Sequence, residues 1–335
     1  MEASISSIAQ RAKVSVATVS RVLNNSPRVS PKTRSKIEKI MDETGYTPRV
    51  MKNRRAHLGL VIIEPEPKIQ AYKSEVISGV MDYIARENLS FSLLYFPPVP
   101  IQRMDLFKEL RERGCDAGLL ACNGYQLPED IFCHNFPLVV LNEELDYKQA
   151  NSVSMDETAG TIDAARHLIS LGHKHIAVVG KIPGSNAVKR EMALKQCFEQ
   201  EGLDPEQIIT INNFGLYPAE ESGKAMGDYL FSNYPEVTAV LAFSDNFAYG
   251  IMNAAQERGL QIPEDISIIG FNDFSSSAYF NPPLTVVKQP RFMMGSRAAE
   301  IAHKLFDGRL KSPVDSILPV SFELRKSTAR CRASK

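Results

Sequence analysis

From Leu58 onward, short apolar runs alternate with stretches in which apolar residues recur every three or four positions. A continuous apolar run of four to eight residues is typical of a buried parallel strand, and the longer periodic stretches are typical of amphipathic helices. The alternation therefore predicts an α/β fold with helices on both faces of parallel sheets. The expected strands are Leu58–Ile63, Phe91–Tyr95, Ala117–Ala121, Leu138–Leu141, Ile176–Gly180, Ile208–Ile211, Ala239–Phe243 and Ile266–Phe271.

Helices are expected between these strands, and residues 58–335 are too many for one such sheet. Two sheets, each in its own subdomain with a crevice between them, are the natural partition. The expected helices of this core are 75–86, 103–113, 160–171, 190–201, 220–233 and 247–258.

The first 45 residues have a different pattern, with helical periodicity only. Ser4 can cap a helix over residues 5–11, and Ser15 a second over residues 16–23. A third helix begins at Ser30-Pro31 and stops at Gly45. Two short helices joined by a tight turn indicate a helix-turn-helix unit.

Charge separates this head from the remainder. Residues 1–57 hold 12 Lys and Arg against 4 Asp and Glu, a balance of +8 that the rest of the chain offsets to zero. A basic module on an acidic body suggests a nucleic-acid binder, although a solvated basic face would give the same excess.

Composition limits the other classes. The chain has 335 residues, 44% of them hydrophobic and 23% charged, as expected for a soluble globular protein. The beginning at Met1 lacks a basic start followed by an apolar core, and no apolar run is long enough to span a bilayer, so we expect a cytoplasmic, nucleoid-associated protein. Five cysteines without a Cys-x-x-Cys pair are expected to be unpaired thiols.

The second helix should expose side chains suited to a DNA groove. Val16 and Ala17 are small enough to allow close approach to base edges, and Arg21 can donate two hydrogen bonds to a guanine. Each could instead be an idle surface residue. The residues placed for phosphates are Ser15, Thr18, Ser20, Lys13 and Arg28.

Polar residues follow several core strands at their carboxyl ends, where ligands of open parallel sheets bind. Asn142, Ser244-Asp245 and Asn272 follow strands, and Arg190 starts the helix after another. Together with Tyr72 and Tyr217 they make a plausible cleft for a small polar ligand. The alternative is that Asn, Asp and Ser simply cap helices there.

The head resembles the DNA-binding headpiece of the LacI/GalR (lactose-repressor/galactose-repressor) family. The resemblance rests on Ile8-Ala9, Val14 through Asn24, Arg28 through Arg34, and Gly45-Tyr46-Thr47-Pro48. It implies base contacts by Val16, Ala17 and Arg21, within a DNA-binding set of Ser15, Val16, Ala17, Thr18, Ser20, Arg21, Asn24, Arg28, Arg54 and Arg55.

The head departs from that family in two places. Lys13 occupies a turn position where the family typically has glycine in a left-handed conformation, at a cost of about 1 kcal/mol. The linker after Pro48 is about five residues short, and a basic run that includes Arg54 and Arg55 stands where relatives place a leucine that wedges into the minor groove. The resemblance therefore leaves operator bending in doubt.

The core is similar to the same family in three stretches, Leu168–Ala177, Ile262–Asp273 and Pro282–Pro290. The resemblance implies an all-α helix-turn-helix headpiece plus an α/β core of two Rossmann-like, periplasmic-binding-protein-like parallel-sheet subdomains. The implied domains are residues 1–47 (headpiece), 48–57 (short basic hinge) and 58–335 (effector and dimerisation core, with subdomains 58–153 plus 291–318 and 154–290 plus 319–330).

In the family, the effector lies between the two subdomains. The implied effector-binding residues are Tyr72, Asn142, Arg190, Tyr217, Ser244, Asp245, Asn272 and Gln289. Relatives usually carry Asp at positions 142 and 272 and Asn at 244, so the effector is expected to be anionic or only lightly hydroxylated. The expected function is a homodimeric repressor on a palindromic double-stranded DNA operator, controlled by a sugar or sugar derivative.

The sequence gives little support for an enzyme, because it has no nucleophile elbow, no phosphate loop and no dinucleotide turn. His173 and His175 stand two apart, which fits a polar turn better than a metal site. We therefore expect no catalytic residues, no metal and no cofactor. The alternative function is a solute-binding protein of the periplasmic type, which would have no basic three-helix head.

Overall fold

The structure is a computed structural model that describes residues 4–23, 28–44, 55–63, 71–96, 103–121, 131, 136–141, 150–181, 187–215 and 219–332. The backbone of Tyr72 is described within a helix, but its side chain is not. Four expected site residues, Asn24, Arg54, Asn142 and Tyr217, lie outside the described residues.

The head consists of α1 (Ile5–Ala12), α2 (Val16–Leu23) and α3 (Pro31–Thr44). Their apolar faces meet in a small core. Serines start the helices as expected: the Ser4 side chain accepts from the backbone N–H of Ser7, and Ser30 Oγ accepts from Thr33 N–H at 3.2 Å. The buried core residues are Ile8, Ala9, Ala12, Val19, Val22 and Ile37.

The first sheet of the core has the strand order β11-β5-β4-β3-β1-β2. The pairings from β2 through β5 are parallel. Helix α5 packs on one face through Leu106, Phe107 and Leu110. The elements are β1 (His57–Ile63), α4 (Ala71–Arg86), β2 (Ser90–Phe96), α5 (Arg103–Glu112), β3 (Ala117–Ala121), β4 (Leu138–Leu141), β5 (Asn151–Met155), α10 (Arg291–Phe306) and β11 (Asp315–Leu318).

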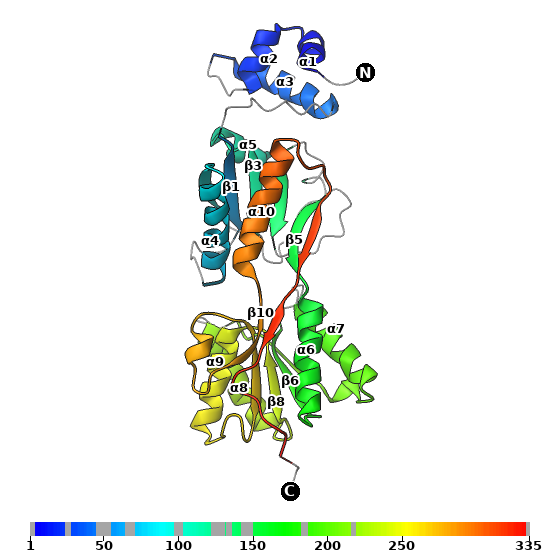
Figure 1. Ribbon diagram of the computed structural model, residues 1–335, viewed down its shortest axis with the longest axis vertical. Helices are drawn as coiled ribbons and strands as arrows, with labels where there is room; N and C mark the ends of the chain where they lie inside the picture. Colours follow the sequence, from blue (N-terminus) through cyan, green and yellow to red (C-terminus); the bar gives the residue numbers. More distant parts are fainter. Residues whose placement is uncertain are drawn as a thin grey trace. The chain divides into compact units, whose positions relative to one another are not determined.

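The second sheet has the order β12-β10-β9-β8-β6-β7, parallel except for β12. Helices α6 and α7 cover one face and α8 and α9 the other (Figure 1). Both faces are therefore buried, as a parallel sheet requires. The elements are α6 (Glu157–Ser170), β6 (Ile176–Lys181), α7 (Ala187–Gln200), η2 (Pro205–Gln207), β7 (Ile209–Asn212), α8 (Ala219–Asn233), β8 (Ala239–Ala242), α9 (Asp245–Glu257), β9 (Ser267–Asn272), η3 (Ser277–Tyr279), β10 (Thr285–Lys288) and β12 (Ser321–Glu323).

The chain divides into two compact units, each built from separate stretches of sequence. The first comprises Met1–Lys68, Val76–Val153 and Phe292–Ser316, and the second Ile69–Glu75, Ser154–Arg291 and Ile317–Lys335. Helices α4 and α10 therefore both begin in the second unit and continue in the first. Within the described residues, no helix is long and apolar enough to span a membrane.

The fold class is confirmed, and the expected strands and helices are present with end shifts of a few residues. Four strands were not expected: β5, β10, β11 and β12. β5 reads Asn-Ser-Val-Ser-Met, and its buried polar residues hide the apolar signal. Asn151 is tolerated inside because its Nδ2 donates to the Leu138 carbonyl at 3.0 Å and its Oδ1 accepts from Ser312 and Val314.

Candidate functional site

Helix α2 has a buried face and an exposed face. Val19 and Val22 are buried in the head core, whereas Val16 is 45% exposed, and Ala17 and Arg21 are exposed as well. Exposing a valine costs free energy unless a partner covers it. The exposed face thus offers two small apolar side chains and one guanidinium, as a major-groove reader requires.

Three other predicted DNA contacts, Ser15, Thr18 and Ser20, lie at the start of α2 or within it. Ser15 Oγ accepts from Thr18 N–H at 3.1 Å and lies 2.8 Å from Thr18 Oγ1, so both hydroxyls take part in capping α2. Ser20 and Thr18 are half-buried. Arg28 and Arg55 are exposed. The helix cap therefore fixes the start of α2.

Lys13 ends α1 in the left-handed conformation, with φ 55° and ψ 46°. Its backbone N–H donates to the carbonyls of Ala9 and Gln10, as in a helix C-cap where glycine is usual. The conformation turns the chain so that α2 begins three residues later. At the far end of α2, Arg34 Nη1 donates to the Val22 carbonyl at 3.3 Å and ties α3 to α2.

A second group of polar residues gathers at the carboxyl ends of β8, β9 and β10 in the second unit. Arg190 on α7 is 8% exposed, and its Nε donates to Glu157 Oε2 at 3.0 Å. Its Nη1 donates to the Phe243 carbonyl at 3.0 Å, and its guanidinium lies 3.7 Å from the centre of the Phe271 ring. Stacking and hydrogen bonds together hold this arginine in one orientation.

Glu157 brings two predicted effector residues together. Gln289 Nε2 donates to Glu157 Oε1 at 2.6 Å, while Arg190 occupies the other oxygen. The carboxylate is 5% exposed, at the first turn of α6. Sequence reasoning missed Glu157 because it follows β5, the strand that was also missed; an acidic residue next to an Asp N-cap was the available signal.

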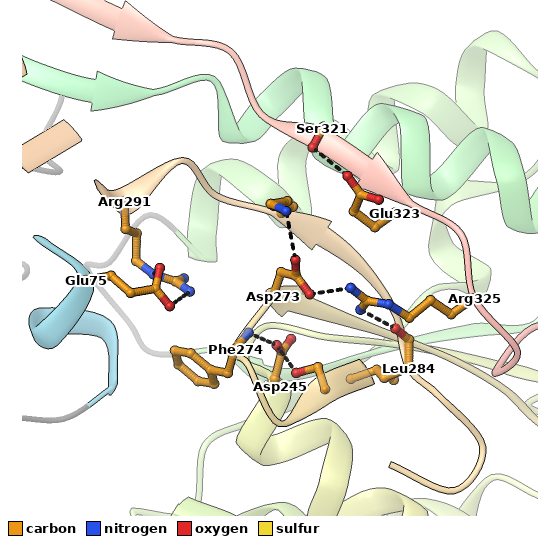
Figure 2. Close-up of polar contacts among 11 residues, drawn as sticks. Glu75, Asp245, Asp273, Phe274, Leu284, Arg291, Ser321, Glu323 and Arg325 are labelled. Atoms are coloured by element: carbon orange, nitrogen blue, oxygen red, sulfur yellow. Dashed lines mark hydrogen bonds and ion pairs between the residues drawn. The ribbon is translucent and has the colours of Figure 1, made fainter. Parts of the chain in front are cut away.

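Ser244 caps α9, and Asp245 beside it is fully buried. Asp245 Oδ2 accepts from Phe274 N–H at 2.8 Å and from Ser277 Oγ at 2.5 Å (Figure 2). Its Oδ1 has no hydrogen-bond partner among the described residues. Burial raises the pKa of this carboxyl, against hydrogen bonds that lower it. Asp245 thus fixes the loop after β9 from beneath.

Asn272 and Asp273 form a strained turn at the end of β9. Their φ angles are 138° and 64°, in a region that side chains other than glycine rarely adopt. Asp273 is held by Arg325 Nη2 at 2.6 Å and by Lys288 Nζ at 3.3 Å (Figure 2). Such strain typically costs about 1–3 kcal/mol per residue and persists where the surroundings fix it, often at a binding site. The turn leaves the Asn272 side chain half-buried.

Two further cations belong to this region of the second unit, and neither was expected. Arg291 is 1% exposed, contacts both carboxylate oxygens of Glu75 and lies 4.9 Å from the centre of the Phe274 ring (Figure 2). Lys73, on the first turn of α4, is 3% exposed, and burial lowers its pKa. No group of three or more metal-ligating side chains occurs within the described part of the chain.

A hollow of about 430 Å³, lined by both apolar and polar side chains, lies on the surface of the second unit, beside α9. Tyr249 and Phe280 form a tilted pair with ring centres 4.8 Å apart, and Tyr279 is 87% exposed. An exposed aromatic group of this kind commonly marks an interface. The lining residues are Tyr249, Met252, Asn253, Gln256, Ser276, Tyr279, Phe280 and Asn281.

Comparison with known proteins identifies both parts of the chain. A family model described as bacterial regulatory proteins, lacI family, matches residues 4–49, and a periplasmic binding protein-like domain matches residues 165–328. The transcriptional regulator DegA of Bacillus subtilis is 31% identical, covering 98% of this chain and 99% of its own. The transcriptional repressor PurR of Vibrio atlanticus is 30% identical, covering 89% of this chain and 90% of its own.

Among solved structures, the complex of the transcriptional regulator CelR with cellobiose is 26% identical to this chain with a TM-score of 0.70. The match covers 97% of this chain and 99% of that one. Head and core therefore occur together in relatives over nearly their whole length.

Proposed function

This chain belongs to the lacI family of bacterial regulatory proteins and is a DNA-binding transcriptional regulator, and we propose that it is a homodimeric repressor controlled by a small polar effector. The two heads of the dimer bind the half-sites of a palindromic double-stranded operator. The protein acts in the cytoplasm, at the nucleoid. Its domains are residues 1–47, 48–57 and 58–335. Its relatives are regulators and not enzymes.

The observation that carries DNA reading is the exposed face of α2. Val16, Ala17 and Arg21 contact base edges in the major groove, because they are exposed on α2 and have shapes that fit there. Sequence-independent contacts to phosphates come from the surrounding cations and hydroxyls. The proposed set is Ser15, Val16, Ala17, Thr18, Ser20, Arg21, Asn24, Arg28, Arg54 and Arg55.

The experiment is selection of duplexes from a random pool by the full-length protein, followed by affinity measurements on the selected sequence. Arg21→Ala should weaken binding to that sequence by about 1–3 kcal/mol and relax preference at one base pair per half-site. Arg11→Ala is the matched control, because Arg11 is an exposed head arginine on α1, 3.9 Å from Glu43. Equal losses on selected and random duplexes would contradict base reading by Arg21.

The effector site is proposed at the carboxyl edge of the second sheet. Glu157 and Asp273 already have both carboxylate oxygens occupied by protein donors, and Asp245 is fully buried. Arg190 Nη2, in contrast, has no hydrogen-bond partner among the described residues. The edge thus presents a donor in Arg190 Nη2. A ligand rich in acceptors, such as a sugar carrying a phosphate or carboxylate, fits best.

The sugar class is supported by CelR, whose solved structure holds cellobiose. The proposed contacts are Tyr72, Asn142, Arg190, Tyr217, Ser244 and Asn272. The buried Asp245 and Gln289, which are bonded within the protein, are proposed to hold these contacts in place.

Thermal unfolding in the presence of glucose, glucose 6-phosphate, gluconate and their relatives tests this site, since ligand binding to the folded state raises the melting temperature. We expect a rise with an acidic member of the set and not with its neutral parent. Arg190→Ala should abolish that rise while leaving affinity for the selected duplex nearly unchanged. An unchanged rise in Arg190→Ala would remove the site from this edge.

A further inference from the structure

Five buried or half-buried side chains of the second unit form one continuous hydrogen-bonded chain. Arg190 donates to Glu157 at 3.0 Å, and Gln289 Nε2 donates to the other oxygen of Glu157 at 2.6 Å. Arg291 Nη1 donates to Gln289 Oε1 at 3.3 Å. Arg291 Nε and Nη2 then donate to the two oxygens of Glu75 at 3.2 and 3.3 Å.

Each side-chain polar atom in the middle of this chain has a partner. Glu157 uses one oxygen for Arg190 and the other for Gln289, and Gln289 uses its amide nitrogen for Glu157 and its oxygen for Arg291. If the amide of Gln289 rotated by half a turn, its oxygen would face the Glu157 carboxylate and its NH2 group would face the Arg291 guanidinium. Both contacts would then be repulsive, so the orientation of the amide is fixed. A change at Arg190 is felt at Arg291 because each link fixes the orientation of the next.

Burial makes a partly broken chain costly. The side chain of Arg291 is fully buried and that of Glu157 is 6% exposed. Removing one partner of a buried ion pair leaves the other charge without compensation in a region of low dielectric. The arrangement is therefore stable when all its links are formed and unstable when only some are.

The Glu75 end of the chain lies where two helices begin. Glu75 is on the second turn of α4, and Arg291 is the first residue of α10. Beyond this point the two helices touch through their backbones: a Cβ on Gly79 would lie 1.9 Å from the Phe292 carbonyl oxygen, and one on Gly295 would lie 2.0 Å from that of Val76. Two helices in such close contact move as one body, and both continue into the first unit.

We propose that this chain is a relay through which the state of Arg190 sets the positions of α4 and α10. Glu75, Gln289 and Arg291 are positioning residues in it, with Arg291 as the central link. The proposal rests on the proposed function for one point, that the effector binds at Arg190. An effector that accepts from Arg190 Nη2 turns the guanidinium, and the bond from Arg190 Nε to Glu157 changes with it. A shift of Glu157 then changes what Gln289 and Arg291 hold.

Hydrogen exchange of the full-length protein, without DNA or effector, tests the relay. Arg190→Gln and Glu157→Gln should accelerate exchange of backbone amides in α4 and α10 by about tenfold, although neither residue belongs to those helices. Glu191→Gln is the matched control. Glu191 neighbours Arg190 on α7, is equally buried at 8% exposed and binds Lys181 and Thr210, outside the relay. It should leave α4 and α10 unchanged.

A double-mutant cycle separates a relay from two independent local supports. Exchange in α10 is compared in Arg190→Gln, Glu75→Gln and the variant carrying both, and in a relay the double variant is no worse than the more damaging single one. Arg190→Lys keeps the positive charge and should protect the amides of α10 better than Arg190→Gln does. This variant tests the relay even if Arg190→Gln unfolds.

Amide exchange that is accelerated only in α6 and α7 would overturn the relay. So would a double variant whose effect on exchange in α10 equals the sum of the effects of the two single variants. Neither outcome touches the proposed function, because duplex selection and the effector's thermal shift are measured separately. Conversely, a protein that bound no duplex would still give a valid exchange result.

Discussion

Three acidic residues at the carboxyl edge of the second sheet show how environment decides what a side chain can do. Glu157 binds Arg190 and Gln289, Asp273 binds Arg325 and Lys288, and Asp245 binds a hydroxyl and an amide while fully buried. Of the three, the sequence points only to Asp245 as an effector contact. In the folded chain none has a free carboxylate oxygen open to solvent at this edge, which is why we propose a ligand that accepts hydrogen bonds.

His173 gives a residue-level prediction about pH. It is 3% exposed, its Nδ1 lies 2.9 Å from Thr238 Oγ1 and its Nε2 donates to the Ala329 carbonyl at 3.0 Å. Burial lowers the pKa of this histidine below its ordinary value of 6.5. Because the unfolded chain binds the proton more readily, the stabilisation is complete above about pH 6.5 and is lost as the pH falls through the lower folded value.

The free energy of unfolding should therefore fall between about pH 7.5 and about pH 5.5, and His173→Gln should reduce that slope. Urea unfolding followed by circular dichroism measures it. The slope should not vanish, since burial also lowers the pKa values of His167 and His303. His175→Gln, at an exposed position two residues away, is the control and should leave the slope intact. A slope unaffected by His173→Gln would be inconsistent with a neutral buried imidazole.

At the scale of elements, the sequence predicts those whose periodicity and caps agree. Helix α2 begins at Val16 and ends at Leu23, as expected, because Ser15 caps it and Val19 and Val22 give its buried face. The short strands β11 and β12 could not be predicted, since they are largely exposed and are defined by the neighbouring strands with which they pair.

The candidate sites divide in the same way. Arg21 and Arg190 follow from the sequence because each stands at a recognisable end or face of an element. The partners Glu157, Arg291 and Glu75 do not, since their contacts join residues 132 and 216 positions apart, and no local pattern encodes such pairs. Domain bounds and site assignments otherwise remain predictions.

The turn between α1 and α2 gives an element-level prediction. Lys13 holds a left-handed conformation that costs about 1 kcal/mol for a residue with a Cβ, and glycine removes that cost. Lys13→Gly should slow amide exchange in α1 and α2 by about fivefold. Asn88→Gly is the control, with amide exchange measured in the flanking α4 and β2. Asn88 has φ 54°, but asparagine tolerates this region, so glycine should slow exchange there by less than about fivefold. Faster exchange in the Lys13 variant would show that the lysine side chain itself stabilises the turn.

At the scale of the whole molecule, exposed apolar side chains suggest where two copies meet. Tyr279, Tyr249 and Phe280 surround the hollow beside α9 in the second unit, and Phe292 and Met293 are about half exposed on α10 in the first. A twofold dimer would cover the same patches on both copies. We expect these surfaces to form the dimer interface.

Tyr279→Asp should therefore raise the dimer dissociation constant by at least about tenfold in sedimentation equilibrium, because it places a charge in an apolar contact. Met192→Asp is the matched control, since Met192 is 65% exposed on α7, away from the hollow. A Tyr279 variant that dimerises as tightly as the Met192 variant would move the interface elsewhere.

The two edge strands β11 and β12 are separated by only two residues, yet each completes a different sheet. During synthesis on the ribosome, the last edge strand of each sheet therefore emerges at almost the same time. Neither sheet can be completed long before the other. The final folding steps of the two units are thereby synchronised. A nascent polypeptide that is stalled before Asp315 lacks one edge strand in each sheet.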